Sequence, residues 1–167
     1  MLTVENYIDS MKANLEKHSN LLVANLKSIM AFNYSPEIDL LDYTAFIEPT
    51  NFEISIELFS MDKEANEVFN DGHDTTIFAG SVNVISDVTY YQLKEQSLDD
   101  FFERFYEEND QAIYELEQQT FTDWFSQCWE EAGGFSVNYP TYFVFHDDDK
   151  SFDLKNKKWV EDEAKWS

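Results

Sequence analysis

The segment Phe52-Glu-Ile-Ser-Ile-Glu-Leu58 alternates strictly between apolar and polar residues. In an extended chain the apolar side chains, which are Phe52, Ile54, Ile56 and Leu58, all point to one face, and the polar ones point to the other. A strand with one buried and one hydrated face is typical of antiparallel sheets. The segment therefore predicts a half-buried strand in a mainly antiparallel sheet.

More strands are expected after this one. The turn at Asn70-Asp-Gly72 precedes residues 75–85, which have the composition of a strand with Gly80 as a candidate bulge. Residues 88–93 predict another strand, so we assign strands to the region 52–93.

Near the C-terminus, aromatic residues flank an aspartate-rich turn. This pattern predicts a hairpin over residues 141–154, with Phe143 and Phe145 on one face and Tyr142 and Val144 on the other.

Two regions show the three- and four-residue spacing of apolar side chains that predicts helices. Residues 1–31 are expected to be helical, with a break at His18-Ser-Asn20 and either Ser19 or Asn20 as the N-cap. Residues 97–132 are expected to form two helices. Their start resembles a capping box at Ser97-Leu-Asp-Asp100, they are interrupted at Asn109-Asp110, and they end at Gly133-Gly134.

The order of these elements is helix, strands, helices, strands. Because the strands are grouped and do not alternate with helices, an α+β fold is expected. A length of 167 residues suits one domain. We predict a single domain over residues 1–167, with the sheet packed against N-terminal and central amphipathic helices.

The chain is strongly acidic, with a formal net charge of −23 and 34 Asp and Glu residues. Residues 32–131 hold 24 of these acids and only three bases, Lys63, Lys94 and Arg104. Such a field repels nucleic acids and anionic lipids and attracts basic proteins. We therefore expect a basic protein partner, and neither nucleic acid nor membrane binding. No phosphate-binding glycine loop is present, and no cofactor is expected.

The expected location is the cytoplasm. No apolar run approaches the roughly 20 residues that cross a bilayer, and the single cysteine, Cys128, has no intramolecular disulfide partner. Its aromatic and acidic neighbours predict a buried core thiol rather than a nucleophile. Ten lysines against one arginine, together with many Asn, Ile and Tyr residues, are typical of an A+T-rich bacterial genome.

The central helical region contains acids at i,i+4 spacing, such as Glu103 and Glu107, whose mutual repulsion an external cation would relieve. We predict that this region contacts the partner, with Tyr106 and Tyr114 as aromatic anchors. The expected acidic contacts are Asp99, Asp100, Glu103, Glu107, Glu108 and Asp110.

In size, charge and expected compartment, the chain resembles the immunity proteins and antitoxins that neutralise bacterial nuclease toxins, although it contains no motif of a known family. The resemblance implies that the acidic surface sequesters a basic partner, for example a nuclease-type toxin whose phosphate-binding cleft it occupies.

Two alternatives remain open. One is a metal-dependent hydrolase that uses His73, His146 and clustered aspartates, with His146, Asp147 and Asp149 as metal ligands. The same residues also suit an ordinary polar turn. The other alternative is a housekeeping domain whose charge serves only solubility.

Overall fold

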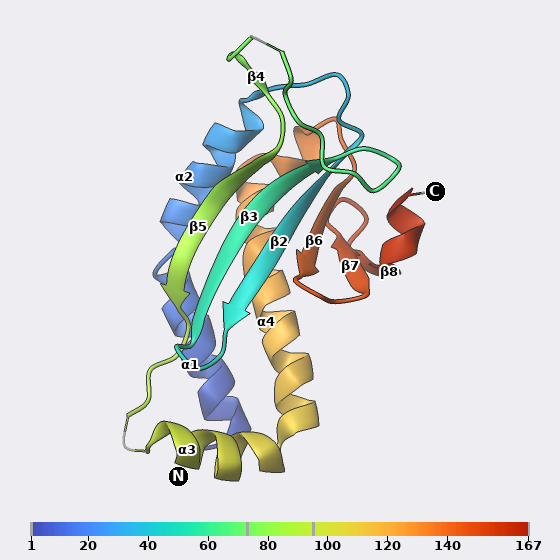
Figure 1. Cartoon of the computed structure of the whole chain (residues 1–167). Helices are drawn as coiled ribbons and strands as arrows, with labels where there is room; N and C mark the ends of the chain where they lie inside the picture. The colour runs from blue at the N-terminus through green and yellow to red at the C-terminus, as the bar shows by residue number, and fades with distance from the viewer. Residues whose placement is uncertain (1, 73, 95, 167) are drawn as a thin grey trace.

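The computed structural model describes residues 2–72, 74–94 and 96–166. Figure 1 shows a twisted sheet with the long helices packed behind it. The helices are α1 (Val4–Glu16), α2 (Ser19–Met30), α3 (Leu98–Asp100), the π-helical η1 (Phe101–Tyr106), α4 (Asp110–Glu131), and the 3-10 turns η2 (Gly134–Ser136) and η3 (Asp162–Trp166). The strands are β1 (Asn33–Tyr34), β2 (Leu40–Glu48), β3 (Glu53–Met61), β4 (Ile77–Phe78), β5 (Ser81–Thr89), β6 (Thr141–Phe145), β7 (Lys150–Asp153) and β8 (Lys158–Glu161).

The main sheet has six strands in the order β5-β3-β2-β6-β7-β8, and β1 pairs with β4 in a separate ribbon. Every neighbouring pair in the main sheet is antiparallel except β2 and β6, which are parallel. The predicted α+β class with a mainly antiparallel sheet is confirmed.

The strand β2 lies in the interior of the sheet, and the sequence analysis did not predict it. Leu40, Leu41, Asp42 and Tyr43 are consecutive buried residues, so β2 is covered on both faces there. A strand buried on both faces shows no hydrophobic alternation, which is the signal that was used for residues 52–58.

The alternating segment forms the predicted strand from Glu53 onward, whereas Phe52 lies in the preceding turn with φ +52°. In β3 the side chains of Ile54, Ile56 and Leu58 are fully buried, and the residues between them are half-buried. The prediction for residues 75–85 was partly wrong, because the chain turns at Gly80 (φ +86°) and divides this stretch into β4 and β5.

The prediction of a separate strand at residues 88–93 was also wrong. Val88 and Thr89 belong to β5, and the chain is irregular from Tyr90 to Leu93. Tyr90 and Tyr91 are nevertheless buried, so their hydrophobic signal reports packing in the core and not a strand.

The helical regions largely follow the sequence. Ser97 caps α3 by accepting a 3.2 Å hydrogen bond from the backbone N–H of Asp100, and α4 begins after Asn109. Gly133 adopts the predicted left-handed conformation (φ +99°). Within the described residues, no helix combines the length and apolar character needed to cross a membrane.

The N-cap prediction for α2 was wrong. The cap position is His18, and Ser19 is the first helical residue. The Ser19 hydroxyl is used in tertiary packing instead, since it donates to Glu16 and accepts a 3.0 Å hydrogen bond from the indole N–H of Trp124.

The C-terminal hairpin is confirmed as β6 and β7, and β8 extends it by one more strand. Phe143 and Phe145 face the helices, where Phe143 stacks on Phe125 with ring centroids 4.6 Å apart. Tyr142, on the opposite face, lies beneath the ammonium group of Lys165.

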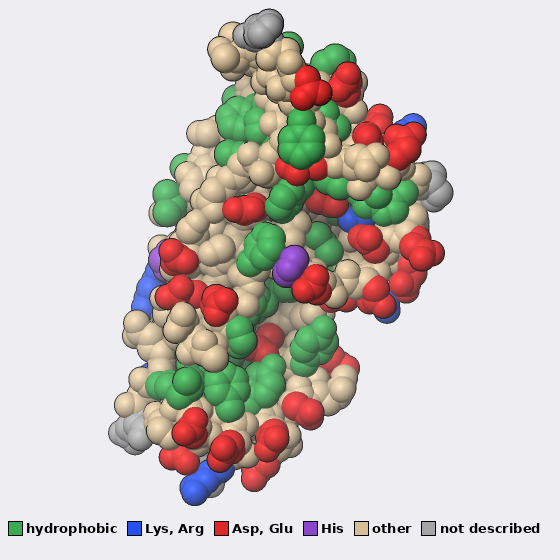
Figure 2. Space-filling view, in the orientation of Figure 1, with side chains coloured by type: hydrophobic (Ala, Val, Ile, Leu, Met, Phe, Trp, Pro, Cys, Tyr) green, Lys and Arg blue, Asp and Glu red, His purple; other side chains and the backbone are tan. Residues whose placement is uncertain are grey.

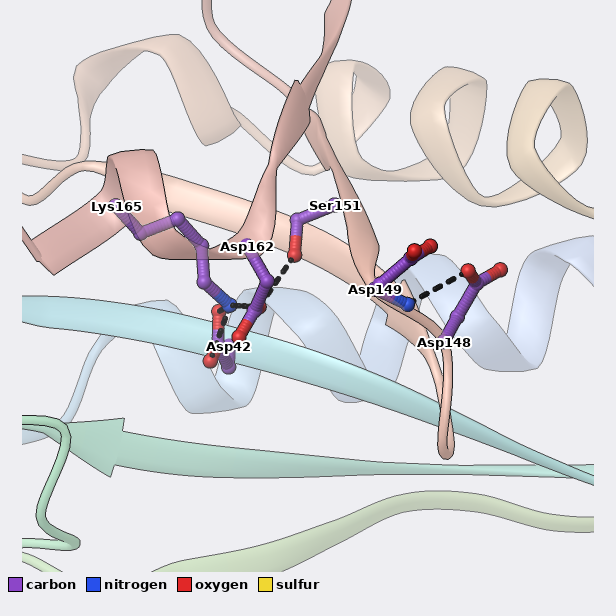
Figure 3. A network of polar contacts seen from close by, with 6 residues as sticks. All are labelled: Asp42, Asp148, Asp149, Ser151, Asp162 and Lys165. Carbon is purple, nitrogen blue, oxygen red and sulfur yellow. Dashed lines mark hydrogen bonds and ion pairs between the residues drawn. The ribbon is translucent and has the colours of Figure 1, made fainter.

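Lys165 fastens the C-terminal turn η3 to the sheet (Figure 3). Its Nζ lies 3.0 and 2.9 Å from the two carboxylate oxygens of Asp42 and 2.8 Å from Asp162. Asp162 also accepts a 3.1 Å hydrogen bond from Ser151. We call Asp42, Asp162 and Lys165 the C-terminal clasp. Burial raises the pKa of the Asp42 carboxyl, and the ammonium of Lys165 opposes that rise.

Candidate binding cleft

A cleft of about 320 Å³ opens between the ends of β2 and β6 and the N-terminal half of α4. Figure 2 shows hydrophobic side chains around a hollow in the lower half of this face, with acidic side chains beside and below them. Segments distant in sequence form it, namely the β2–β3 turn, η1, α4 and the β6–β7 turn, together with Tyr7 of α1 and Tyr90, which follows β5. Its aromatic walls include Phe52, Phe102, Tyr106, Tyr114, Phe121 and Phe145.

The polar centre of the cleft is the carboxylate of Glu117 on α4. One of its oxygens accepts a 2.7 Å hydrogen bond from the hydroxyl of Tyr7, and the other accepts a 2.9 Å bond from Tyr106. Tyr7 is held in place by edge contacts with Tyr91 and Phe105. The two hydroxyls therefore fix the orientation of the carboxylate.

Burial raises the pKa of Glu117, while the hydrogen bonds from Tyr7 and Tyr106 lower it. Burial also raises the pKa of each of these tyrosines, and the charge of Glu117 adds to that rise. Both tyrosines thus remain protonated donors at physiological pH.

Among the residues that the structure describes, no cationic side chain forms an ion pair with Glu117. A buried carboxylate is normally paired with a cation or with several donors, because desolvation of the charge is costly. Within the part of the chain that the structure describes, the donors to Glu117 are the hydroxyls of Tyr7 and Tyr106. The cleft therefore holds a partly compensated negative site.

The structure brings Tyr106, Tyr114, His146 and Asp147 together at this cleft, although the sequence analysis had assigned them to two different hypotheses. Tyr114 is half exposed at the rim. His146 packs its ring 4.7 Å from that of Phe46 and lies 3.4 Å from Asp147.

The six predicted acidic contacts are all exposed, and they do not share one face. Asp100 and Glu108 line a different hollow beside the start of α1, where Asp100 lies 3.6 Å from Arg104. Asp110 is close enough to the cleft for its charge to raise the pKa of Tyr106.

Asp99, Glu103 and Glu107 form an outward stripe. The aromatic side chains of η1 face inward, since Phe101 is buried and Phe102, Phe105 and Tyr106 pack against the core. Residues four apart lie close together on a helix surface. The remaining outer face carries Asp99, Glu103 and Glu107, which we call the acidic stripe.

For the metal hypothesis, no three His, Cys, Asp or Glu side chains in residues 2–72, 74–94 and 96–166 gather closely enough to hold a metal ion. His73 lies outside the described residues. Asp149 donates its backbone N–H to the Asp148 carboxylate at 2.8 Å, within the β6–β7 turn (Figure 3).

The buried position predicted for Cys128 is confirmed. Its side chain is enclosed by the core, and burial raises the pKa of the thiol to about 11. A thiol of this pKa is protonated at neutral pH and is a poor nucleophile.

Sequence reasoning missed Glu117 and Tyr7. Glu117 lies midway between Ile113 and Phe121 in the apolar stripe of α4, so a carboxylate there interrupts a row of buried side chains. That interruption was a usable signal for a functional carboxylate.

The comparisons with known proteins give no family. No family model, no curated protein and no solved structure matches this chain.

Proposed function

We propose that this chain is a small cytoplasmic binding protein of bacteria that sequesters a basic protein through the acidic stripe and the neighbouring cleft. The observation that carries the proposal is the location of Glu117, a half-buried carboxylate without a cation among the described residues, in a cleft bordered by further acids.

The electrostatic surroundings support an extended acidic surface. Asp148 and Asp149 both raise the pKa of Tyr114 at the rim, after the larger effect of burial. On the segment that bears the stripe, Arg104 is the one base, and it lines the hollow beside the start of α1. The net charge of −23 extends this field beyond the contact surface.

The partner class follows from charge complementarity. A nuclease binds phosphates with clustered Lys and Arg side chains, so an acidic surface on a rigid helix can occupy that cluster. Long-range attraction speeds such an association and makes it sensitive to salt. Inhibition of a nuclease-type toxin is the biological role that we propose for the complex.

The test is affinity capture from the native host at low and high salt. Wild-type protein is compared with a stripe variant, Asp99→Lys with Glu103→Lys and Glu107→Lys, and with a control of equal charge change at exposed residues elsewhere, Glu64→Lys with Asp71→Lys and Glu163→Lys. The captured protein is identified, and its association rate is measured against each variant.

We expect a basic protein that binds wild type and the control, with an association rate about tenfold lower for the stripe variant. Capture of no basic protein, or equal rates for the stripe and control variants, would contradict the proposal.

A further inference from the structure

We propose that the cleft is a specific receptor for one arginine side chain, whose guanidinium group pairs with Glu117 between aromatic walls. This inference deepens the proposed function and rests on it for the source of the arginine, which we take to be the basic partner.

The acceptor geometry of Glu117 favours a guanidinium. Each carboxylate oxygen can accept two hydrogen bonds, and each already accepts one from a tyrosine hydroxyl, Tyr7 on one oxygen and Tyr106 on the other. One acceptor position therefore remains on each oxygen. Two adjacent acceptors on one carboxylate match the paired N–H groups of arginine, which form two parallel hydrogen bonds.

The walls of the cleft favour the same group. Tyr106 and Phe102 pack against each other with ring centroids 5.8 Å apart, and both line the cleft, as does the exposed ring of Tyr114. A guanidinium is flat and weakly hydrated, so it stacks on aromatic faces more readily than the compact ammonium of lysine.

The volume of the cleft and the charge at its rim also suit one arginine side chain. A volume of about 320 Å³ lies at the lower end of the range of small-ligand sites, which fits a single side chain rather than a folded segment. Asp147 and Asp148 lie at the rim, so the entrance is negative as well. Gln118 donates a 3.2 Å hydrogen bond to Asp148 and anchors the rim to α4.

The experiment uses the whole protein and a small probe. N-acetylated, C-amidated Gly-Arg-Gly is titrated into the protein and followed by calorimetry and amide NMR. The same tripeptide with citrulline, the neutral isostere of arginine, is the matched control ligand, and the lysine tripeptide tests guanidinium preference.

We expect the arginine tripeptide to bind about tenfold more tightly than the citrulline tripeptide, because a charge-assisted hydrogen-bonded pair is lost in the latter. The perturbed amide resonances should cluster around the cleft, at Gln118 and His146. Equal binding of the two tripeptides, or perturbations elsewhere, would overturn the proposal.

Glu117→Gln should reduce arginine binding to the level of citrulline, while Glu131→Gln, an exposed change on the same helix, should leave it unaltered. Tyr114→Ala, at the exposed rim, should weaken arginine binding severalfold and serves if Glu117→Gln does not fold. Full arginine binding by both cleft variants would refute the assignment.

The experiments distinguish a failure of the arginine receptor site from a failure of the proposed function. If the tripeptide binds as expected and no basic protein is captured, the receptor site stands and the proposed function falls. If a basic protein is captured through the stripe and the tripeptide does not distinguish arginine from citrulline, only the receptor site falls.

Discussion

Asp42 and Glu117 are two inward-facing carboxylates with opposite surroundings. Asp42 lies on the interior strand β2 and is held by the ammonium of Lys165, at 3.0 and 2.9 Å. Glu117 lies on α4 and is held only by tyrosine hydroxyls, with no cation among the described residues. Burial raises the pKa of both carboxyls.

The two carboxylates differ in whether the chain itself supplies a positive charge beside them. The pair in the C-terminal clasp is complete within the chain, with Lys165 inaccessible to solvent, so it joins the C-terminal turn to the sheet. Glu117 lines an open cleft and lacks the opposite charge that Asp42 has. A cation from outside the chain can therefore pair with the carboxylate of Glu117, whereas none can reach that of Asp42.

The largest expected effect comes from breaking the clasp. Lys165→Met leaves Asp42 buried without its cation, which should lower the free energy of unfolding by about 3–5 kcal/mol. Urea denaturation measures this. The double change Lys165→Met with Asp42→Leu should recover most of the loss, because both buried charges are then removed. A single variant as stable as wild type would show that the clasp contributes nothing.

Removing one donor from Glu117 should have a smaller effect. Tyr106→Phe deletes the 2.9 Å hydrogen bond to a carboxylate, and should cost about 1.5–3 kcal/mol. Tyr139→Phe, a half-buried tyrosine in a different aromatic cluster, is the matched control and should change stability by less than about 0.5 kcal/mol. Equal losses of unfolding free energy in the two variants would mean that the hydroxyl of Tyr106 contributes no more to stability than that of Tyr139.

The pH dependence should be smaller still. The pKa of Glu117 is raised in the folded state, so the folded protein binds more protons than the unfolded chain. Stability should therefore rise as the pH falls from neutral toward the ordinary glutamate pKa of about 4.3. Tyr7, Tyr90 and Tyr106, which face Glu117, stay protonated throughout this range.

Melting temperatures of wild type and Glu117→Gln between neutral and mildly acidic pH provide the measurement. The rise on acidification should be smaller in the variant, which has no carboxyl at this position. Identical pH profiles, or a wild-type melting temperature that falls on acidification at low salt, would contradict the stated surroundings of Glu117.

The two regions also show which parts of the fold the sequence reveals. Local patterns predicted β3, the break before α4 and the C-terminal hairpin, because each depends on neighbouring residues. The interior strand β2 has no alternation, so its pattern resembles any short buried segment.

The partners of the two carboxylates were not predictable from local patterns, although the place of Glu117 in the apolar stripe of α4 was a usable signal. Tyr7 and Glu117 are 110 residues apart, and Asp42 and Lys165 are 123 apart. Only the tertiary fold brings such pairs together. The sequence did predict that Tyr106, Tyr114, His146 and Asp147 matter, and the structure places them at one cleft without testing their roles.

The most direct test of the account is the titration of the Glu117 side-chain carboxyl by carbon NMR, with and without the arginine tripeptide. The free protein should show a Glu117 pKa above that of an ordinary glutamate, because the half-buried carboxyl is partly desolvated and has no cation beside it among the described residues. Saturation with the tripeptide should lower that pKa, since a guanidinium favours the charged form, and the citrulline tripeptide should not. An ordinary pKa in the free protein that neither tripeptide changes would contradict the central claim.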